Sequence, residues 1–113
     1  MNTQIFGKSK CFDTKKAERY FKERNIKYQF VDIVKYGISN GEYQNVKASI
    51  GNIHGLIDEK SQEYEKHHIR HLSRQDSIEE RLLSNPTLFK TPIVRNGKKA
   101  TIGYQPDIWK TWD

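Results

Sequence analysis

The dipeptide Asn96–Gly97 imposes the strongest local constraint on the fold of this chain. It lies between two short β-prone runs, 93–95 and 100–102, within the stretch KTPIVRNGKKATIGY. Asn-Gly is the favoured centre of a type I′ hairpin turn, because both of its residues accept positive φ angles. The stretch therefore predicts an antiparallel hairpin close to the C-terminal end of the sequence.

The first third of the chain has the pattern of a strand, a helix and a second strand. Residues 3–6 are β-prone, and residues 27–33 are an alternating run rich in aromatic and β-branched residues. Between them, the stretch 13–26 repeats apolar residues at helical spacing, and Asp13 or Thr14 is expected to cap its first turn. Strand–helix–strand over roughly 30 residues is a βαβ unit.

The middle of the chain, from about residue 36 to 86, is predicted to be a helical insertion. Ser39 followed by Glu42 is a capping-box pattern, and Asp76 followed by Glu79 repeats the same capping logic. The apolar stripes of the two predicted helices are Tyr43, Val46 and Ile50 in the first and Ile78, Leu82 and Leu83 in the second.

A terminal helix is expected after the hairpin. Pro106 suits the first turn of a helix, and Trp109 and Trp112 are expected to pack on the sheet. Without the insertion, the order of elements is then βαβ followed by ββα, which is the plan of the α/β thioredoxin-like fold. A chain of 113 residues has the usual size of one domain, so we expect residues 1–113 to form a single domain.

The positive charge is spread along the chain rather than gathered in one region. The formal net charge is +6, but the 20 Lys and Arg residues are interleaved with 14 Asp and Glu residues, as on solvated helix faces. A nucleic-acid site needs a clustered basic face, so we expect no nucleic-acid partner. A small anion or an acidic partner surface is the other reading of this charge. No apolar run approaches the roughly 18 residues of a membrane helix, so no membrane partner is expected.

Cys11 is the only cysteine, and it lies just before the first predicted helix among lysines. The free N–H groups and the dipole at a helix start favour a thiolate and can bind an anion. Lys15 falls about one helical turn further on, within reach of a bound anion. These features predict a thiolate nucleophile beside an oxyanion pocket. The alternative is a buried cysteine that only fills space, as free cysteines often do.

Position 14 holds Thr, so the chain has no C-x-x-C motif. An oxidised Cys11 must therefore be resolved by an outside thiol, such as glutathione or a glutaredoxin-like protein. A lone cysteine without a signal segment suggests a reducing, cytoplasmic location. The histidines His67 and His71 have the i, i+4 spacing of some metal ligands, but no third ligand motif accompanies them. We expect surface histidines, no metal site and no bound cofactor.

The chain resembles the ArsC (arsenate reductase)/Spx family over essentially its whole length, and within it the ArsC-like, or YffB-like, branch. The segment CFDTKKAERYF resembles the family's Cys-x-x-x-(Arg/Lys)-Lys-Ala segment, and LIDEKSQEYEKHHI resembles its mid-chain segment. The stretch NPTLFKTPIVRNGKKATIGYQPDIW resembles its C-terminal signature, which includes a cis proline.

The resemblance implies roles for particular residues. Cys11 would be the nucleophile, and Lys15, Lys60, Lys90 and Thr91 would lie at the anion site, beside a cis Pro92, although X-Pro bonds in general favour trans. The family's reductases have Arg where this chain has Thr91, and a second Arg near Gln105. Lysine replaces the arginine fork only as a point charge, so the resemblance implies an anion site without the full arginine clamp of the reductases.

Three functions remain open from the sequence. The first is a thiol-dependent, arsenate reductase-like oxidoreductase acting on a small oxyanion or a glutathione mixed disulfide, with glutathione or glutaredoxin as the external reductant. The second is a non-enzymatic, Spx-like regulator that binds RNA polymerase or another protein. The third is a family member in which Cys11 is inert.

Overall fold

Four strands form one mixed sheet in the computed structural model, which describes residues 3–67, 69 and 72–112. The strands are β1 (Thr3–Gly7), β2 (Tyr28–Asp32), β3 (Ile93–Asn96) and β4 (Lys99–Ile102), and their order in the sheet is β2–β1–β3–β4. β1 is parallel to β2 and antiparallel to β3, and β3 is antiparallel to β4. This is the mixed α/β, thioredoxin-like arrangement that the sequence predicts.

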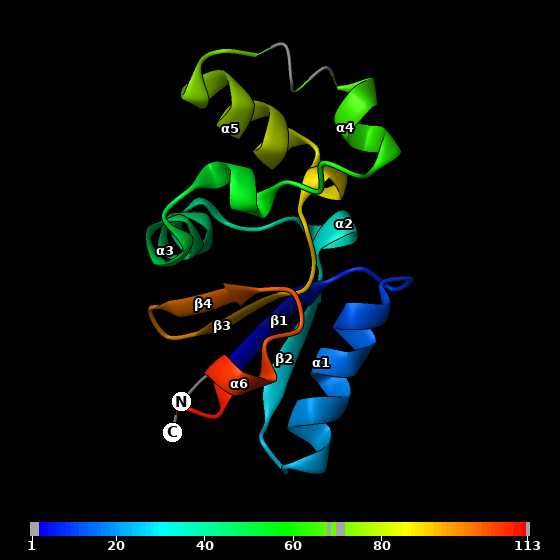
Figure 1. Ribbon diagram of the computed structural model, residues 1–113, viewed down its shortest axis with the longest axis vertical. Coiled ribbons are helices and arrows are strands. Elements are labelled where there is room, and N and C mark those ends of the chain that lie inside the picture. Colours follow the sequence, from blue (N-terminus) through cyan, green and yellow to red (C-terminus); the bar gives the residue numbers. More distant parts are fainter. Residues whose placement is uncertain (1–2, 68, 70–71, 113) are drawn as a thin grey trace.

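The helices lie on both sides of this sheet (Figure 1). They are α1 (Phe12–Glu23), α2 (Ile33–Tyr36), α3 (Asn40–Ile50), α4 (Gln62–Lys66), α5 (Gln75–Ser84) and α6 (Pro106–Trp109), with 3₁₀ turns η1 (Ile53–Leu56) and η3 (Pro86–Leu88). In Figure 1, α3, α4 and α5 lie on the opposite side of the sheet from α6. Within the described residues, no helix has both the length and the apolar character needed to cross a bilayer.

Successive side chains of the central strands point to opposite faces of the sheet, and each face carries a separate apolar core. Ile5 and Val94 belong to the core under α1 and α6, together with Ala17, Tyr20, Phe21, Trp109 and Trp112. Phe6 and Ile93, one residue along each strand, belong to the larger core under α3 and α5, with Tyr43, Val46, Ile78 and Leu82. Both predicted helical stripes therefore face the larger core. In the smaller core, Trp109 also donates to Thr101 Oγ1 at 2.8 Å.

The hairpin is present, but its turn is one residue later than predicted. Asn96 is the last residue of β3 and pairs with Lys99, which leaves Gly97 and Lys98 as the two central residues. Of these two residues, only Gly97 has a positive φ, at 62°. Glycine at the first central position is typical of a type II′ turn, so the predicted type I′ turn is wrong.

Helix caps were predicted with mixed success. The Ser39–Glu42 capping box of α3 is confirmed. For α1, the N-cap is Cys11, and Asp13 and Thr14 lie inside the first turn. For α5, the N-cap is Arg74, which places Asp76 in the first turn, where its carboxylate faces the positive end of the helix dipole. Both α1 and α5 therefore start before the residue that was predicted to cap them.

Candidate functional site

The backbone holds Cys11 at the junction between the β1–α1 loop and α1. Its N–H donates to the Lys8 carbonyl at 3.0 Å, and its own carbonyl accepts the first helical hydrogen bond from Lys15 N at 3.2 Å. Its φ and ψ, −89° and 119°, are extended, and its side chain makes no capping bond. The thiol is half-buried at this N-cap position.

The Cys11 thiol lines an open hollow of about 390 Å³. The sulfur donates to the carbonyl oxygen of Thr91 at 3.6 Å, across the junction between the β1–α1 loop and the segment before β3. The Thr91–Pro92 peptide bond in that segment is cis, the isomer that the family resemblance implies. The remaining lining consists of Lys8, Lys10, Asp13, Asp58 and Lys90. The hollow thus combines one thiol with three lysines and two carboxylates.

The structure brings together some of the residues singled out in the sequence and separates others. Lys90 and Thr91 line the same hollow as Cys11. Lys60 lines an adjacent hollow of about 360 Å³, which shares Asp58 and Lys90 with the first. Lys15 is exposed on α1 and lies outside the lining of both hollows. The lysines that line the hollow beside Cys11 are Lys8, Lys10 and Lys90, and a role of Lys15 in binding an anion stays a prediction.

Asp58 belongs to this site and has no signal in the sequence. Asp58 N donates to Leu88 O at 2.9 Å, and Lys90 N donates to Leu56 O at 2.8 Å. A β-bridge between Ile57 and Phe89 joins the same two segments. This pairing places Asp58 beside Lys90 although they are far apart in the chain, so only the tertiary structure reveals their proximity.

Opposing effects set the pKa of the Cys11 thiol. Burial raises it, whereas hydrogen bonds that the ionised sulfur can accept lower it, from the side chains of Thr14 and Thr91 and from the backbone of Thr14 and Asp13. The net result is a pKa below the ordinary value of a cysteine. The structure therefore favours the thiolate, the reactive form of the side chain.

The amine of Lys8 is anchored by a backbone carbonyl group. It donates to the Thr87 carbonyl at 2.8 Å. Burial lowers its pKa, while attraction to Asp58, Cys11 and Glu63 raises it, and the net shift is downward. Since the Lys8 ammonium and the Cys11 thiolate attract each other, each favours the charged form of the other.

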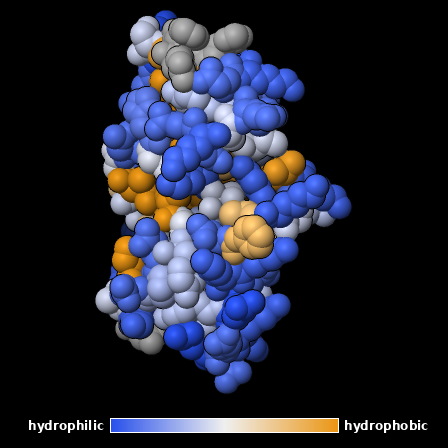
Figure 2. All heavy atoms as spheres, turned by 45° about the vertical axis from the view of Figure 1, so that its right-hand side comes forward, coloured by the Kyte–Doolittle hydropathy of each residue, from blue (hydrophilic) through white to orange (hydrophobic). Residues whose placement is uncertain are grey.

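On the face shown in Figure 2, hydrophobic side chains form small separate groups among hydrophilic ones. Among the large hydrophobic residues that the structure describes, the most exposed is Phe12, which is 80% exposed and directly follows Cys11. An aromatic side chain so exposed beside a half-buried thiol is available for contact with a partner molecule.

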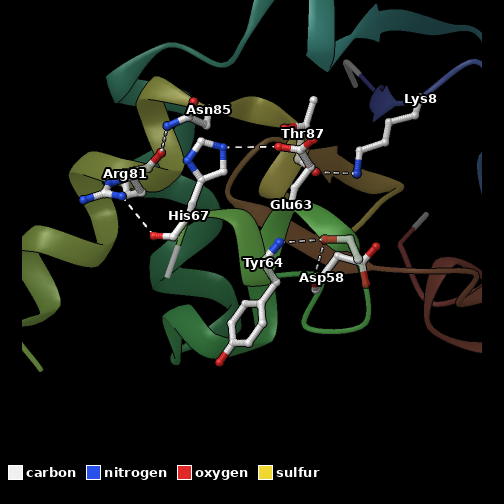
Figure 3. A network of polar contacts seen from close by, with 9 residues as sticks. Lys8, Asp58, Glu63, Tyr64, His67, Arg81, Asn85 and Thr87 are labelled. Atoms are coloured by element: carbon white, nitrogen blue, oxygen red, sulfur yellow. Dashed lines mark hydrogen bonds and ion pairs between the residues drawn. The ribbon is translucent and has the colours of Figure 1, made fainter. Parts of the chain in front are cut away.

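A polar network connects the thiol loop with the helical elements (Figure 3). Lys8 extends towards Thr87 in η3, and Glu63 of α4 is bound to the ring of His67 at 3.2 Å. Arg81 of α5 in turn donates to the His67 carbonyl at 2.9 Å. The position of the Lys8 charge is therefore fixed by elements that lie between β2 and β3 in the chain.

The described residues contain no group of three His, Cys, Asp or Glu side chains arranged to hold a metal ion. His67 is bound to Glu63. His68 and His71 lie outside the described residues, so the spacing of His67 and His71 is not tested by the structure.

Known proteins resemble this chain along nearly its whole length. The model of the ArsC family matches residues 6–112. The global transcriptional regulator Spx 2 of Oceanobacillus iheyensis is 26% identical over 110 residues, covering 95% of this chain and 80% of that protein. An arsenate reductase from Vibrio cholerae superposes with a TM-score of 0.84 at 18% identity, covering 96% of this chain and 94% of that chain. The structure of a YffB protein gives a TM-score of 0.82 at 21% identity, covering 96% of each chain.

Proposed function

Since the chain belongs to the ArsC family, we propose that it is a thiol-dependent oxidoreductase whose nucleophile is the Cys11 thiolate. One observation carries this proposal: a half-buried thiol with a lowered pKa opens into a hollow lined by Lys8, Lys10 and Lys90. A thiolate in such an electropositive, partly exposed setting is typical of reactive cysteines.

The substrate class that fits best is a mixed disulfide between glutathione, or a similar acidic thiol, and another thiol. The hollow contains lysines and no arginine among the residues that line it, and it lacks the planar fork that holds a tetrahedral oxyanion in bidentate fashion. Lys60 and Lys90 border the adjacent hollow, where they would bind the carboxylates of the acidic thiol. The two hollows together would hold one extended, anionic molecule.

The proposed reaction has two exchange steps. The Cys11 thiolate attacks the glutathione sulfur, a new S–S bond forms with Cys11, and the other thiol leaves as a thiolate that takes a proton from water. An external glutathione thiolate then attacks the Cys11-bound sulfur, which releases glutathione disulfide and regenerates the Cys11 thiolate. One mixed disulfide and one thiol are consumed, and one thiol and one disulfide are produced. We place this chemistry in a reducing cytoplasm, with glutathione or a glutaredoxin-like protein as the reductant.

The test uses a peptide–glutathione mixed disulfide, reduced glutathione and a coupled assay for glutathione disulfide. We expect turnover that Cys11→Ser abolishes, that Lys90→Ala weakens through KM, and that the control Lys27→Ala leaves unchanged. Lys27 is exposed and lies outside both hollows. An unchanged rate with Cys11→Ser would reject the proposal. Turnover of arsenate but not of the mixed disulfide would contradict the substrate class.

A second candidate is an Spx-like regulator that binds RNA polymerase or another protein. It is supported by the similarity to a transcriptional regulator and by the exposed aromatic ring of Phe12. Binding of the purified protein to RNA polymerase, measured by interferometry and weakened by Phe12→Ala, would support this role. Equal affinity of Phe12→Ala and the wild type would exclude a contact through Phe12.

A further inference from the structure

The hydroxyl group of Thr14 is buried, and no contact in the described residues offsets the cost of its burial. The residue is 1% exposed, and Oγ1 has no hydrogen-bond partner among the residues that the structure describes. Burying a hydroxyl group in this way costs stability, so most buried hydroxyl groups are satisfied. Thr14 lies three residues after Cys11, in the first turn of α1.

Close packing fixes the orientation of this side chain. A Cβ atom built at Gly7, the last residue of β1, would lie 2.3 Å from Thr14 Cγ2 and 2.8 Å from Oγ1. The Thr14 side chain therefore occupies the space that any other residue at position 7 would fill. Because Gly7 has no side chain, the end of β1 leaves room for the Thr14 side chain in the first turn of α1.

We propose that the Thr14 hydroxyl group is the donor that stabilises the Cys11 thiolate, at the place where a C-x-x-C motif would carry its second sulfur. This inference rests on the proposed nucleophilic role of Cys11. The protonated thiol donates to the Thr91 carbonyl and offers Thr14 no strong acceptor. Ionisation turns the sulfur into a strong acceptor, and the Thr14 hydroxyl is among the groups that then bond to it.

The Thr14 hydroxyl keeps its own proton throughout. The proton lost on ionisation of Cys11 goes to solvent, and only the O–H bond of Thr14 rotates towards the sulfur. Thr14 therefore takes no part in electron transfer and cannot resolve a mixed disulfide. Its position gives a single-cysteine site an activated thiolate while leaving resolution to an external thiol.

The test compares Thr14→Val with Thr14→Ser, using the pH dependence of alkylation of Cys11 by iodoacetamide. Valine keeps the shape of threonine and removes the hydroxyl group, whereas serine keeps the hydroxyl group. We expect alkylation of Thr14→Val to be roughly tenfold slower at pH values below the thiol pKa, as for loss of a hydrogen bond to a charged group. Thr14→Ser should remain within about twofold of the wild type.

At high pH, where every variant is fully ionised, the order should reverse. A thiolate that has lost a hydrogen bond is intrinsically more nucleophilic, so Thr14→Val should react at least as fast as the wild type. A merely structural role of Thr14 would not produce this crossing of the two pH profiles. Identical profiles of Thr14→Val and the wild type would overturn the inference.

The readout needs no substrate, so it is independent of turnover. A thiol pKa that depends on the Thr14 hydroxyl in a protein without reductase activity would support the inference and reject the proposed function. Reductase activity together with a Cys11 pKa that does not change in Thr14→Val would support the proposed function and reject the inference. Circular dichroism of each variant separates both results from failure to fold.

Discussion

At the scale of single residues, the site contains two polar groups whose positions have a stability cost. Thr14 holds a buried hydroxyl group that has no hydrogen-bond partner among the described residues, and Lys8 holds a half-buried amine whose pKa is lowered by burial. Both groups face the Cys11 sulfur or its charge. Polar groups that lower stability are expected at a site whose reactivity depends on them.

The Thr14 hydroxyl group makes the stability of the protein depend on pH in a defined direction. The pKa of Cys11 is lowered on folding, so ionisation of the thiol stabilises the folded state, and this contribution is complete only above the unfolded pKa of about 8.5. It is lost as the pH falls through the folded-state pKa. Below that pH, Thr14→Val should be more stable than the wild type by about 1–3 kcal/mol, because it removes an unsatisfied hydroxyl group.

Thermal melts of both proteins at pH 5 and pH 9 measure this difference. We expect the advantage of Thr14→Val to shrink between the lowered pKa and about 8.5, since only the wild type gains the bond to the thiolate. An advantage that stays constant between the two pH values would contradict the role of the hydroxyl group. Cys11→Ala paired with Thr14→Val is the matched control and should show no such pH dependence.

Replacing Lys8 by Met tests the contribution of its charge to the thiolate. Methionine keeps an apolar stem but loses the ammonium group and its bond to Thr87. The pKa of Cys11 should rise, and alkylation at pH 6 should slow by roughly threefold, as expected for a partly solvated pair of charges. Lys27→Met is the control and should react like the wild type.

At the scale of elements, local sequence patterns predict the strands, the helices and most of their apolar faces. The register of the hairpin turn is missed, because Ile93 and Val94 are positioned by their pairing with Phe6 and Ile5 of β1, which the dipeptide at the turn does not reveal. The start of α1 is missed because Cys11, a weak capping residue, takes the N-cap position. Asp58 is missed because only pairing of distant segments brings it to the site.

The contact between the end of β1 and the first turn of α1 should be intolerant of added volume. In Gly7→Ala the new methyl group would lie far inside van der Waals contact with Thr14. We expect a loss of about 1–3 kcal/mol in the free energy of unfolding, as for other overpacked sites. Urea titration measures it. Combining Gly7→Ala with Thr14→Ala removes Cγ2 and Oγ1 and should restore part of the loss; simple additivity of the two changes would show that the residues do not interact.

At the scale of the whole molecule, the sheet provides the frame and the elements between β2 and β3 complete the site. Cys11 follows β1, Thr91 precedes β3, and Asp58 and Lys60 come from the stretch between η1 and α4. The bond from Lys8 to Thr87 and the pairing of 56–58 with 88–90 hold these parts together. The order of elements therefore predicts the type of fold. The residues that line the hollow depend on these long-range contacts, which the order of elements does not predict.

The net charge of +6 predicts how the protein reacts with charged disulfides. Positive potential over the hollow should attract an anionic disulfide, and salt should screen this attraction once the Debye length falls from about 30 Å at 0.01 M to about 8 Å at 0.15 M. The rate of reaction of Cys11 with glutathione disulfide should therefore fall several-fold over this range. Its reaction with neutral iodoacetamide should change little, because only the charged reagent is steered. Stopped-flow kinetics of both reagents measure the effect.

Lys90→Ala should weaken the salt dependence more than Lys27→Ala, although both remove one charge, because Lys90 lines the hollow itself. Equal effects of the two variants would show that the field of the whole molecule, and not the lysines of the hollow, governs the approach of the disulfide.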